Sequence, residues 1–177
     1  MKRCAWASRE PLISYHDKEW GTPLHDERRL FEFLVLEGAQ AGLSWETVLR
    51  KREAYRKAFD RFDPNKVARY TARDVGRLMK DAGIVRNRAK IAAAIGNAKE
   101  LLAIQKEFKT FDAYVWGFTD PVALSKELRK RGFRFVGPTI ALSFMEATGI
   151  LDHHENGCHH RGRAPRGTRS AARDAGG

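Results

Sequence analysis

Hydrophobic residues recur at intervals of three and four along most of the chain, which is the spacing of helices that bury one face. Leu30, Phe31 and Leu34 follow Asp26 at this spacing. We therefore expect Asp26 to cap a helix that runs towards Glu37. No stretch alternates convincingly as a strand, so the predicted fold class is all-α.

The same pattern predicts the remaining helices. Ser44 is expected to cap a second helix that ends near Phe62, with a buried stripe formed by Val48, Leu49, Tyr55 and Phe59. Two helices within residues 74–104 are expected to meet at a tight turn that starts at Gly83. Shorter helices are expected over residues 63–70, 111–118, 125–131 and 138–149. Residues 1–25, punctuated by Pro and Gly, are interpreted as an irregular arm rich in aromatic side chains.

Length and composition favour a globular protein with one main domain. The chain has 177 residues, of which 42% are hydrophobic. We expect residues 1–158 to form a single all-α domain, in which two lobes could enclose a cleft. Residues 159–177 are rich in Arg, Gly and Ala with almost nothing to bury, so we expect this tail to be disordered.

The chain is strongly basic, with a formal net charge of +11. Five Arg and one Asp in residues 159–177 contribute +4 of this charge, which leaves +7 on residues 1–158. This balance favours an anionic partner, with nucleic acid ahead of membrane.

The sequence shows no signal of secretion or membrane insertion. The N-terminus lacks an apolar stretch of the signal-peptide kind, and no run of 18 apolar residues occurs. With only Cys4 and Cys158, a disulfide framework is not expected. We therefore expect a bacterial-type cytoplasmic protein, associated with the nucleoid when it acts.

Residues 36–45, at the joint between two predicted helices, have the character of a ligand pocket. Glu37 lies among small residues and is followed eight positions later by Trp45. Small residues allow a flat ligand to approach closely, and a carboxylate beside an aromatic ring can hold a planar cationic ring. The alternative is a solvated Glu and a core Trp, which the stretch by itself does not exclude.

Four residues near the two ends of the chain could form a metal site. Cys4 and His16 lie near one end, and His154 and Cys158 lie near the other. Together they would make a tetrahedral site of the structural zinc type, which clamps the N-terminal arm to the C-terminal segment. His153, His159 and His160 compete for the second histidine position, and unrelated thiols and histidines remain the alternative.

The turn at Gly83 could also bind phosphate. Its backbone N–H groups would contact the anion, and Arg86, Arg88 and Lys90 would supply positive charge. An ordinary helical hairpin with solvated basic residues is the alternative.

Several motifs occur together in one order. They are R-C-x-W at residues 3–6, Y-H-D-x-E-W-G at 15–21, L-E-G-x-Q-A-G-L-S-W at 36–45, D-A-G-I at 81–84, K-R-G-F-x-F-V-G at 130–137 and D-H-x-x-x-G-C at 152–158. In these motifs the chain resembles the 3-methyladenine DNA glycosylase I family, constitutive alkylation-repair enzymes of the helix-hairpin-helix superfamily. The resemblance covers roughly residues 2–158.

The resemblance implies a monofunctional glycosylase that hydrolyses the N-glycosidic bond of 3-methyladenine in alkylated duplex DNA and leaves an abasic site. It implies that Glu37 reads the base and is the catalytic residue, that Tyr15 and Trp45 line or stack on the base, and that Trp20 helps to shape the pocket. It also implies one structural Zn²⁺ held by Cys4, His16, His154 and Cys158. Residues 83–90, including Gly83, Arg86, Arg88 and Lys90, would anchor the DNA backbone, and a monomer is expected.

The chain departs from the family pattern at three places. Leu12 replaces an aromatic residue of the pocket, and the loop at residues 118–124 is shorter. His153 beside His154 leaves the choice of ligand open, and the spacing from Gly149 to Cys158 favours His154. Asp112 lies downstream of the hairpin, where related enzymes carry a catalytic Asp, but the resemblance implies that this branch does not use one. A DNA-binding protein of the same fold without useful excision is the alternative function.

Overall fold

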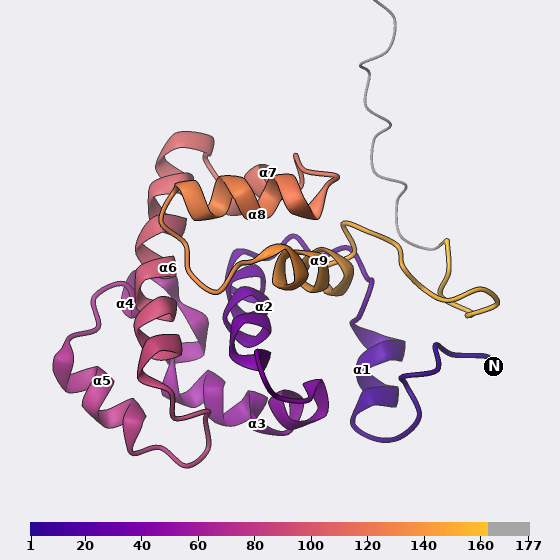
Figure 1. Cartoon of the computed structure of the whole chain (residues 1–177), viewed down its shortest axis with the longest axis horizontal. Helices are drawn as coiled ribbons and strands as arrows, with labels where there is room; N and C mark the ends of the chain where they lie inside the picture. Colours follow the sequence, from indigo (N-terminus) through magenta and orange to yellow (C-terminus); the bar gives the residue numbers. More distant parts are fainter. Residues whose placement is uncertain (163–177) are drawn as a thin grey trace, which may run out of the picture.

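The computed structural model describes residues 1–162 and contains only helices and loops within this range. The all-α prediction is confirmed. Figure 1 shows the helices packed around α2, with the N-terminal arm lying to one side. The helices are α1 (Leu12–Lys18), α2 (Glu27–Gln40), α3 (Trp45–Ala58), α4 (Pro64–Val67), α5 (Ala72–Met79), α6 (Arg88–Phe108), α7 (Phe111–Val115), α8 (Pro121–Lys130) and α9 (Pro138–Ala147), with a 3-10 turn η1 (Asp60–Phe62).

Local capping signals position several of these helices as expected. The side chain of Asp26 accepts a hydrogen bond from Arg29 N at 2.8 Å, and Ser44 Oγ accepts one from Thr47 N at 3.2 Å. Thr71 and Asp74 form the predicted capping box at the start of α5. Each cap satisfies backbone N–H groups that the first turn leaves without a partner. The predicted N-termini at residues 26 and 44 are therefore confirmed.

The predicted irregular arm is wrong in one part, because Leu12–Lys18 form α1. This helix is only seven residues long, and Tyr15 and His16 are its buried residues. A helix this short shows little periodicity, so its aromatic and polar residues were interpreted as irregular. Two other helix ends differ from the prediction. Helix α5 ends at Met79 rather than at Gly83, and α8 begins at Pro121, capped by Asp120, rather than at Ser125.

Helix α2 passes through the centre of the molecule. All of its residues from Leu30 to Ala39 are buried, and α3, α6, α7 and α9 pack against it. A helix with apolar residues on every side is expected to be surrounded by other elements. This position carries Glu37 into the interior.

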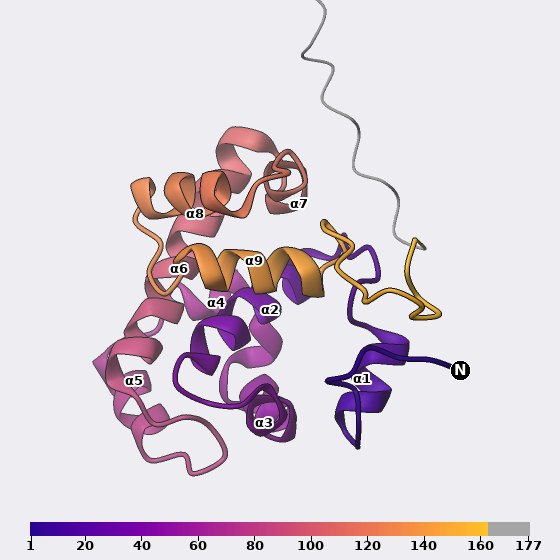
Figure 2. The ribbon, with the colours of Figure 1, turned by 45° about the vertical axis from the view of Figure 1, so that its right-hand side comes forward.

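The N-terminal arm is held by the C-terminal segment, and both views show these two parts side by side (Figures 1 and 2). Ala5 N donates to Glu155 Oε1 at 2.9 Å, and Gly21 N donates to the carbonyl of Ala147 at 3.2 Å. Arg52 of α3 adds a buried ionic contact by bonding both Glu32 of α2 and Glu19, which follows α1. The arm is therefore fixed to the body from two sides.

The predicted disordered tail falls mostly on residues 163–177, which lie outside the described residues. Within the described part, His159 N donates to the carbonyl of Lys2 at 3.0 Å. No helix in residues 1–162 is long and apolar enough to cross a membrane.

Candidate active site and metal centre

A cavity of about 390 Å³ opens between the N-terminal arm, the C-terminal end of α2, the start of α3 and α9. This volume is in the range of small-molecule sites. All four predicted pocket residues, Tyr15, Trp20, Glu37 and Trp45, line it, and so does Leu12. The other lining residues are Trp6, Arg9, Gln40, Ser44, Glu46, Ser143 and Glu146.

Glu37 reaches the cavity from the buried helix α2 and is only 3% exposed. Burial, with a further contribution from the negative charge of Glu146, raises the pKa of Glu37 to about 8. The carboxyl group is therefore mostly protonated at neutral pH while the cavity is empty. A positive ring beside it would favour the ionised form, because an opposite charge at close range stabilises a carboxylate.

The rings of Tyr15 and Trp45 pack against each other in the cavity wall, tilted by 50° with centroids 5.6 Å apart. The hydroxyl of Tyr15 and the indole N–H of Trp45 are both buried and have no hydrogen-bond partner among the described residues. Buried polar groups normally have partners, because leaving one unpaired costs about 1–3 kcal/mol. A planar ligand with polar ring edges would supply both stacking surface and hydrogen-bond partners here.

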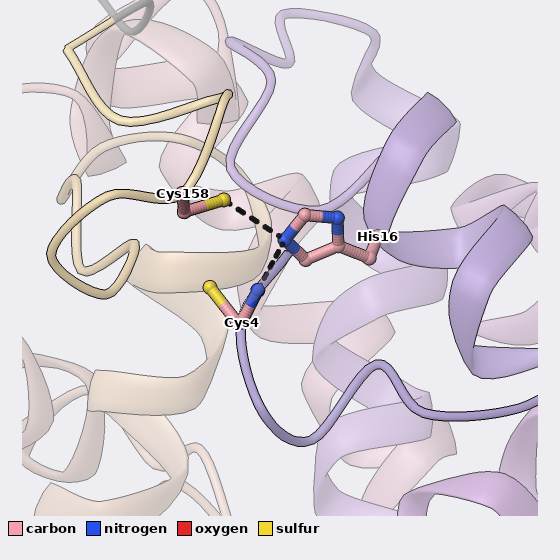
Figure 3. Close-up of side chains that lie close together, drawn as sticks. All are labelled: Cys4, His16 and Cys158. Atoms are coloured by element: carbon pink, nitrogen blue, oxygen red, sulfur yellow. Dashed lines mark hydrogen bonds between the residues drawn. The ribbon is translucent and has the colours of Figure 1, made fainter. Parts of the chain in front are cut away.

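The predicted metal ligands from opposite ends of the chain come together. The ligand atoms of Cys4, His16 and Cys158 lie within 4.8 Å of one another, and all three residues are buried (Figure 3). His16 Nε2 lies 3.4 Å from Cys158 Sγ. Burial raises the pKa of the Cys4 thiol to about 11. A bound cation would reverse this effect, because metal coordination favours the thiolate.

His154 lies beside this group but outside the set of three. Its ring centroid is 5.4 Å from that of His16, and its Nε2 atom is buried without a partner in the described structure. His154 Nδ1 bonds Asp152 Oδ1 at 2.9 Å, and His16 Nδ1 bonds Asp17 Oδ1 at the same distance. A carboxylate on one ring nitrogen, with the other nitrogen left for a metal, is the usual arrangement of metal-binding histidines. The residues present thus fit a Cys2His2 zinc site.

The competing histidines differ in their contacts. His153 Nδ1 bonds Glu146 on α9, and His159 Nδ1 bonds the carbonyl of Lys2. His160 forms a second possible ligand group with His16 and Asp17. By position, either His154 or His160 could supply the fourth ligand. The unpartnered Nε2 atom of His154 favours His154.

Gly83 and Arg86 lie in the connection between α5 and α6, Arg88 begins α6, and both arginines are exposed. A Cβ atom at Gly83 would lie 2.7 Å from the Cβ atom of Ala54, so the close approach of the hairpin to α3 requires glycine. Lys90 is placed differently from the prediction. Its Nζ atom donates to the carbonyls of Ala39 at 2.9 Å and Ala41 at 2.6 Å, which ties the hairpin to the end of α2.

A family model for methyladenine glycosylases matches residues 6–123 and 119–161 of the chain. These matches span the cavity, the hairpin and most of the metal ligands. The chain belongs to the methyladenine glycosylase family.

Named members of this family are similar over almost their whole length. DNA-3-methyladenine glycosylase 1 of Escherichia coli (strain K12) is 49% identical over 179 aligned residues, which cover 89% of this chain and 96% of the relative. A crystal structure of 3-methyladenine DNA glycosylase I superimposes with a TM-score of 0.86 at 45% identity and covers 90% of this chain and 100% of that one. A tyrosine-to-phenylalanine variant of 3-methyladenine DNA glycosylase I in complex with 3-methyladenine gives a TM-score of 0.87 at 36% identity, covering 93% and 100%.

Several cavity residues of this methyladenine glycosylase family member were not predicted from the sequence, among them Trp6, Gln40, Ser143 and Glu146. Trp6 packs edge-on against Trp20 at a centroid distance of 5.1 Å. Ser143 and Glu146 lie three residues apart, on one face of a largely apolar helix, α9. This spacing indicates that the two polar residues share one face of the helix, which could have marked a site. It does not reveal which other element that face of α9 contacts.

Proposed function

We propose that this protein is a monofunctional DNA glycosylase that removes 3-methyladenine from alkylated duplex DNA. The observation that carries the proposal is the cavity, in which a buried carboxyl group and two unpartnered polar aromatic side chains surround space for one base. The names of the relatives support the same substrate.

The chemistry requires little from the protein beyond binding. Methylation at N3 gives the purine a positive charge, so the base leaves readily with the electrons of the C1′–N9 bond. Water adds to C1′ and releases one proton to solvent, and the product is an abasic site with both strands intact. The enzyme must extrude the nucleotide from the duplex and hold the ring, because the target atom is inaccessible in the base stack.

Each proposed substrate-binding residue has a defined contribution. Glu37 approaches the base with its carboxyl group, and it accepts hydrogen bonds and stabilises positive charge once ionised. Tyr15 and Trp45 stack on or border the ring, and such stacking contributes about 1–3 kcal/mol per base. Trp20, held edge-on by Trp6, closes the arm side of the cavity.

The DNA backbone is proposed to bind at the hairpin. Gly83 allows the hairpin to lie close against α3, and Arg86 and Arg88 supply exposed positive charge for phosphates. Lys90 acts there indirectly, through the carbonyls of Ala39 and Ala41. The protein is proposed to work as a monomer on the nucleoid in the bacterial cytoplasm.

The metal site is proposed to hold one structural Zn²⁺ through Cys4, His16, His154 and Cys158. Four protein ligands leave no open position for water, so the ion would stabilise the fold and take no part in the reaction. The unpartnered Nε2 atom of His154 and the paired Nδ1 atoms of both histidines support this set. A purified, folded chain without stoichiometric zinc would contradict it.

The activity is tested by release of free bases from methylated duplex DNA, with 3-methyladenine resolved from 7-methylguanine. Wild type is expected to release 3-methyladenine selectively. Glu37→Gln is expected to lose about 100-fold or more of the rate, the usual effect of removing one electrostatic partner of a transition state. Glu53→Gln, at an exposed position of α3, is the control and is expected to behave as wild type.

The outcomes separate the alternatives. No release by folded, zinc-loaded wild type would favour a DNA-binding protein without excision activity. Release that survives in Glu37→Gln would contradict the role of Glu37 and leave the activity standing.

A further inference from the structure

Three acidic side chains border the cavity, each from a different helix. Glu37 belongs to α2, Glu46 to α3 and Glu146 to α9. Their surroundings differ, so they contribute different amounts of negative charge to a ligand in the cavity.

Glu46 is neutralised by arginines. Its Oε2 atom lies 2.7 Å from Arg9 Nη2, and its Oε1 atom lies 2.9 Å from Arg50 Nη2. Two charge-assisted contacts offset most of the field that this carboxylate could exert on a neighbour.

Glu37 is mostly uncharged at neutral pH while the cavity is empty, since burial and Glu146 raise its pKa to about 8. It cannot then be the main source of negative potential that a positive base meets on entry.

Glu146 remains. Its Oε1 atom contacts His153 Nδ1 at 2.6 Å, and no Lys or Arg of residues 1–162 forms an ion pair with it. The side chain is 22% exposed, so it lies at the boundary between the cavity and solvent. Its charge is nevertheless close enough to Glu37 to disfavour ionisation of that buried carboxyl group.

We propose that Glu146 is a specificity-determining residue, whose carboxylate makes the cavity favour purines that carry a positive charge over neutral purines. The proposal rests on the proposed glycosylase function. In this arrangement Glu146 attracts the alkylated base into the cavity, and Glu37 contacts the ring after it has entered. An unmodified adenine, which has no net charge, gains nothing from Glu146.

The test compares Glu146→Gln, Glu146→Asp and the control Glu53→Gln with wild type. Glutamine keeps the size of the side chain and the oxygen that faces His153, but it removes the charge. We expect Glu146→Gln to lower kcat/KM for release of 3-methyladenine from methylated duplex DNA about tenfold. Glu146→Asp should retain most of it, and Glu53→Gln, at an exposed position of α3 outside the cavity, should behave as wild type.

A second readout is the pH profile of kcat/KM. Removing the charge at position 146 makes ionisation of Glu37 easier, so the limb of the profile that belongs to Glu37 should move to lower pH in Glu146→Gln. The other ionisable groups around the cavity and around Glu146 are Tyr15 on α1, Arg9 in the arm, Glu46 on α3 and His153, which contacts Glu146, and this variant keeps all of them. A purely structural defect would lower the rate without moving this limb.

Unchanged kcat/KM and an unmoved limb in a folded Glu146→Gln variant would overturn the inference, while release by wild type would leave the proposed function intact. Equal losses in Glu146→Asp and Glu146→Gln would also overturn it, since they would show dependence on packing and not on charge. Thermal unfolding of each variant checks that the fold is retained.

Discussion

At the scale of single residues, burial decides what Glu37 can do. The small neighbours of Glu37 and the nearby Trp45 predicted that Glu37 lines a pocket. The structure places Glu37 and Trp45 at the same cavity. The sequence did not predict Glu146 there, because its contact with the cavity depends on how α9 packs against α2, more than 100 positions earlier in the chain. A motif contains residues that are close in sequence. Glu146, whose negative charge raises the pKa of Glu37, is brought near it only by tertiary packing.

Glu37 is expected to make the empty protein less stable as pH rises. The native carboxyl group has a pKa of about 8 against an ordinary value of 4.5, so between these values the native state holds a proton that the unfolded state has released. Stability therefore falls with rising pH through this window. Glu37→Gln lacks this effect, so its free energy of unfolding should exceed that of wild type by roughly 5 kcal/mol above the window, with the difference vanishing below it.

Urea unfolding of both proteins across this pH range measures the difference. Parallel stability curves for wild type and Glu37→Gln would show that the native and unfolded carboxyl groups titrate alike.

At the scale of elements, the starts of helices were predictable and their orientation was not. Asp26, Ser44 and Thr71 cap helices through contacts within three residues, so the sequence carries the whole signal. The connection between α5 and α6 was predicted to contain Gly83 and does, although α5 already ends at Met79. The contacts of the Lys90 side chain were not predicted, because its Nζ atom donates to backbone carbonyls about 50 positions away in the sequence.

The hairpin residues are expected to separate into two classes. The affinity for DNA falls as the salt concentration rises. Arg86→Ala and Arg88→Ala should each make the slope of log affinity against log salt less steep by about 0.9, as expected when one phosphate contact is lost. Lys90→Met should leave this slope unchanged but reduce release of 3-methyladenine several-fold, because the loop after α2 loses its two amine contacts.

Titrations of duplex DNA over a range of salt concentrations, run beside the base-release assay, test this division. A Lys90→Met variant that flattens the slope as the arginine variants do would identify Lys90 as a direct phosphate contact.

At the scale of the whole molecule, the cavity wall depends on the junction of the two chain ends. Tyr15 and Trp20 reach the cavity from the arm, and the arm is held where Cys4 and His16 meet the C-terminal segment. Spacing alone could only suggest this site, because the two halves lie some 138 residues apart in the sequence. The family motifs supplied the pairing, and the structure brings Cys4, His16 and Cys158 together.

Loss of the proposed zinc is expected to detach the arm. Cys158→Ser should contain little zinc, unfold at lower temperature and bind the base poorly, because metal binding is coupled to folding of this region. His159→Asn, outside the proposed ligand set, should keep its zinc. Metal content per chain and limited proteolysis of residues 1–20 measure both effects; a Cys158→Ser protein with a resistant arm and full activity would show that the metal is dispensable.

The closure of the arm by the last described residues also sets an order of events during synthesis. The arm leaves the ribosome before the other described elements, and its partners at residues 154–158 are added some 140 residues later. At about 5–20 residues per second, this delay is roughly 10–30 s. Tyr15 and Trp20 thus reach their places only after residues 154–158 have been synthesised, so a nascent chain that lacks these residues cannot yet hold a base in the completed cavity.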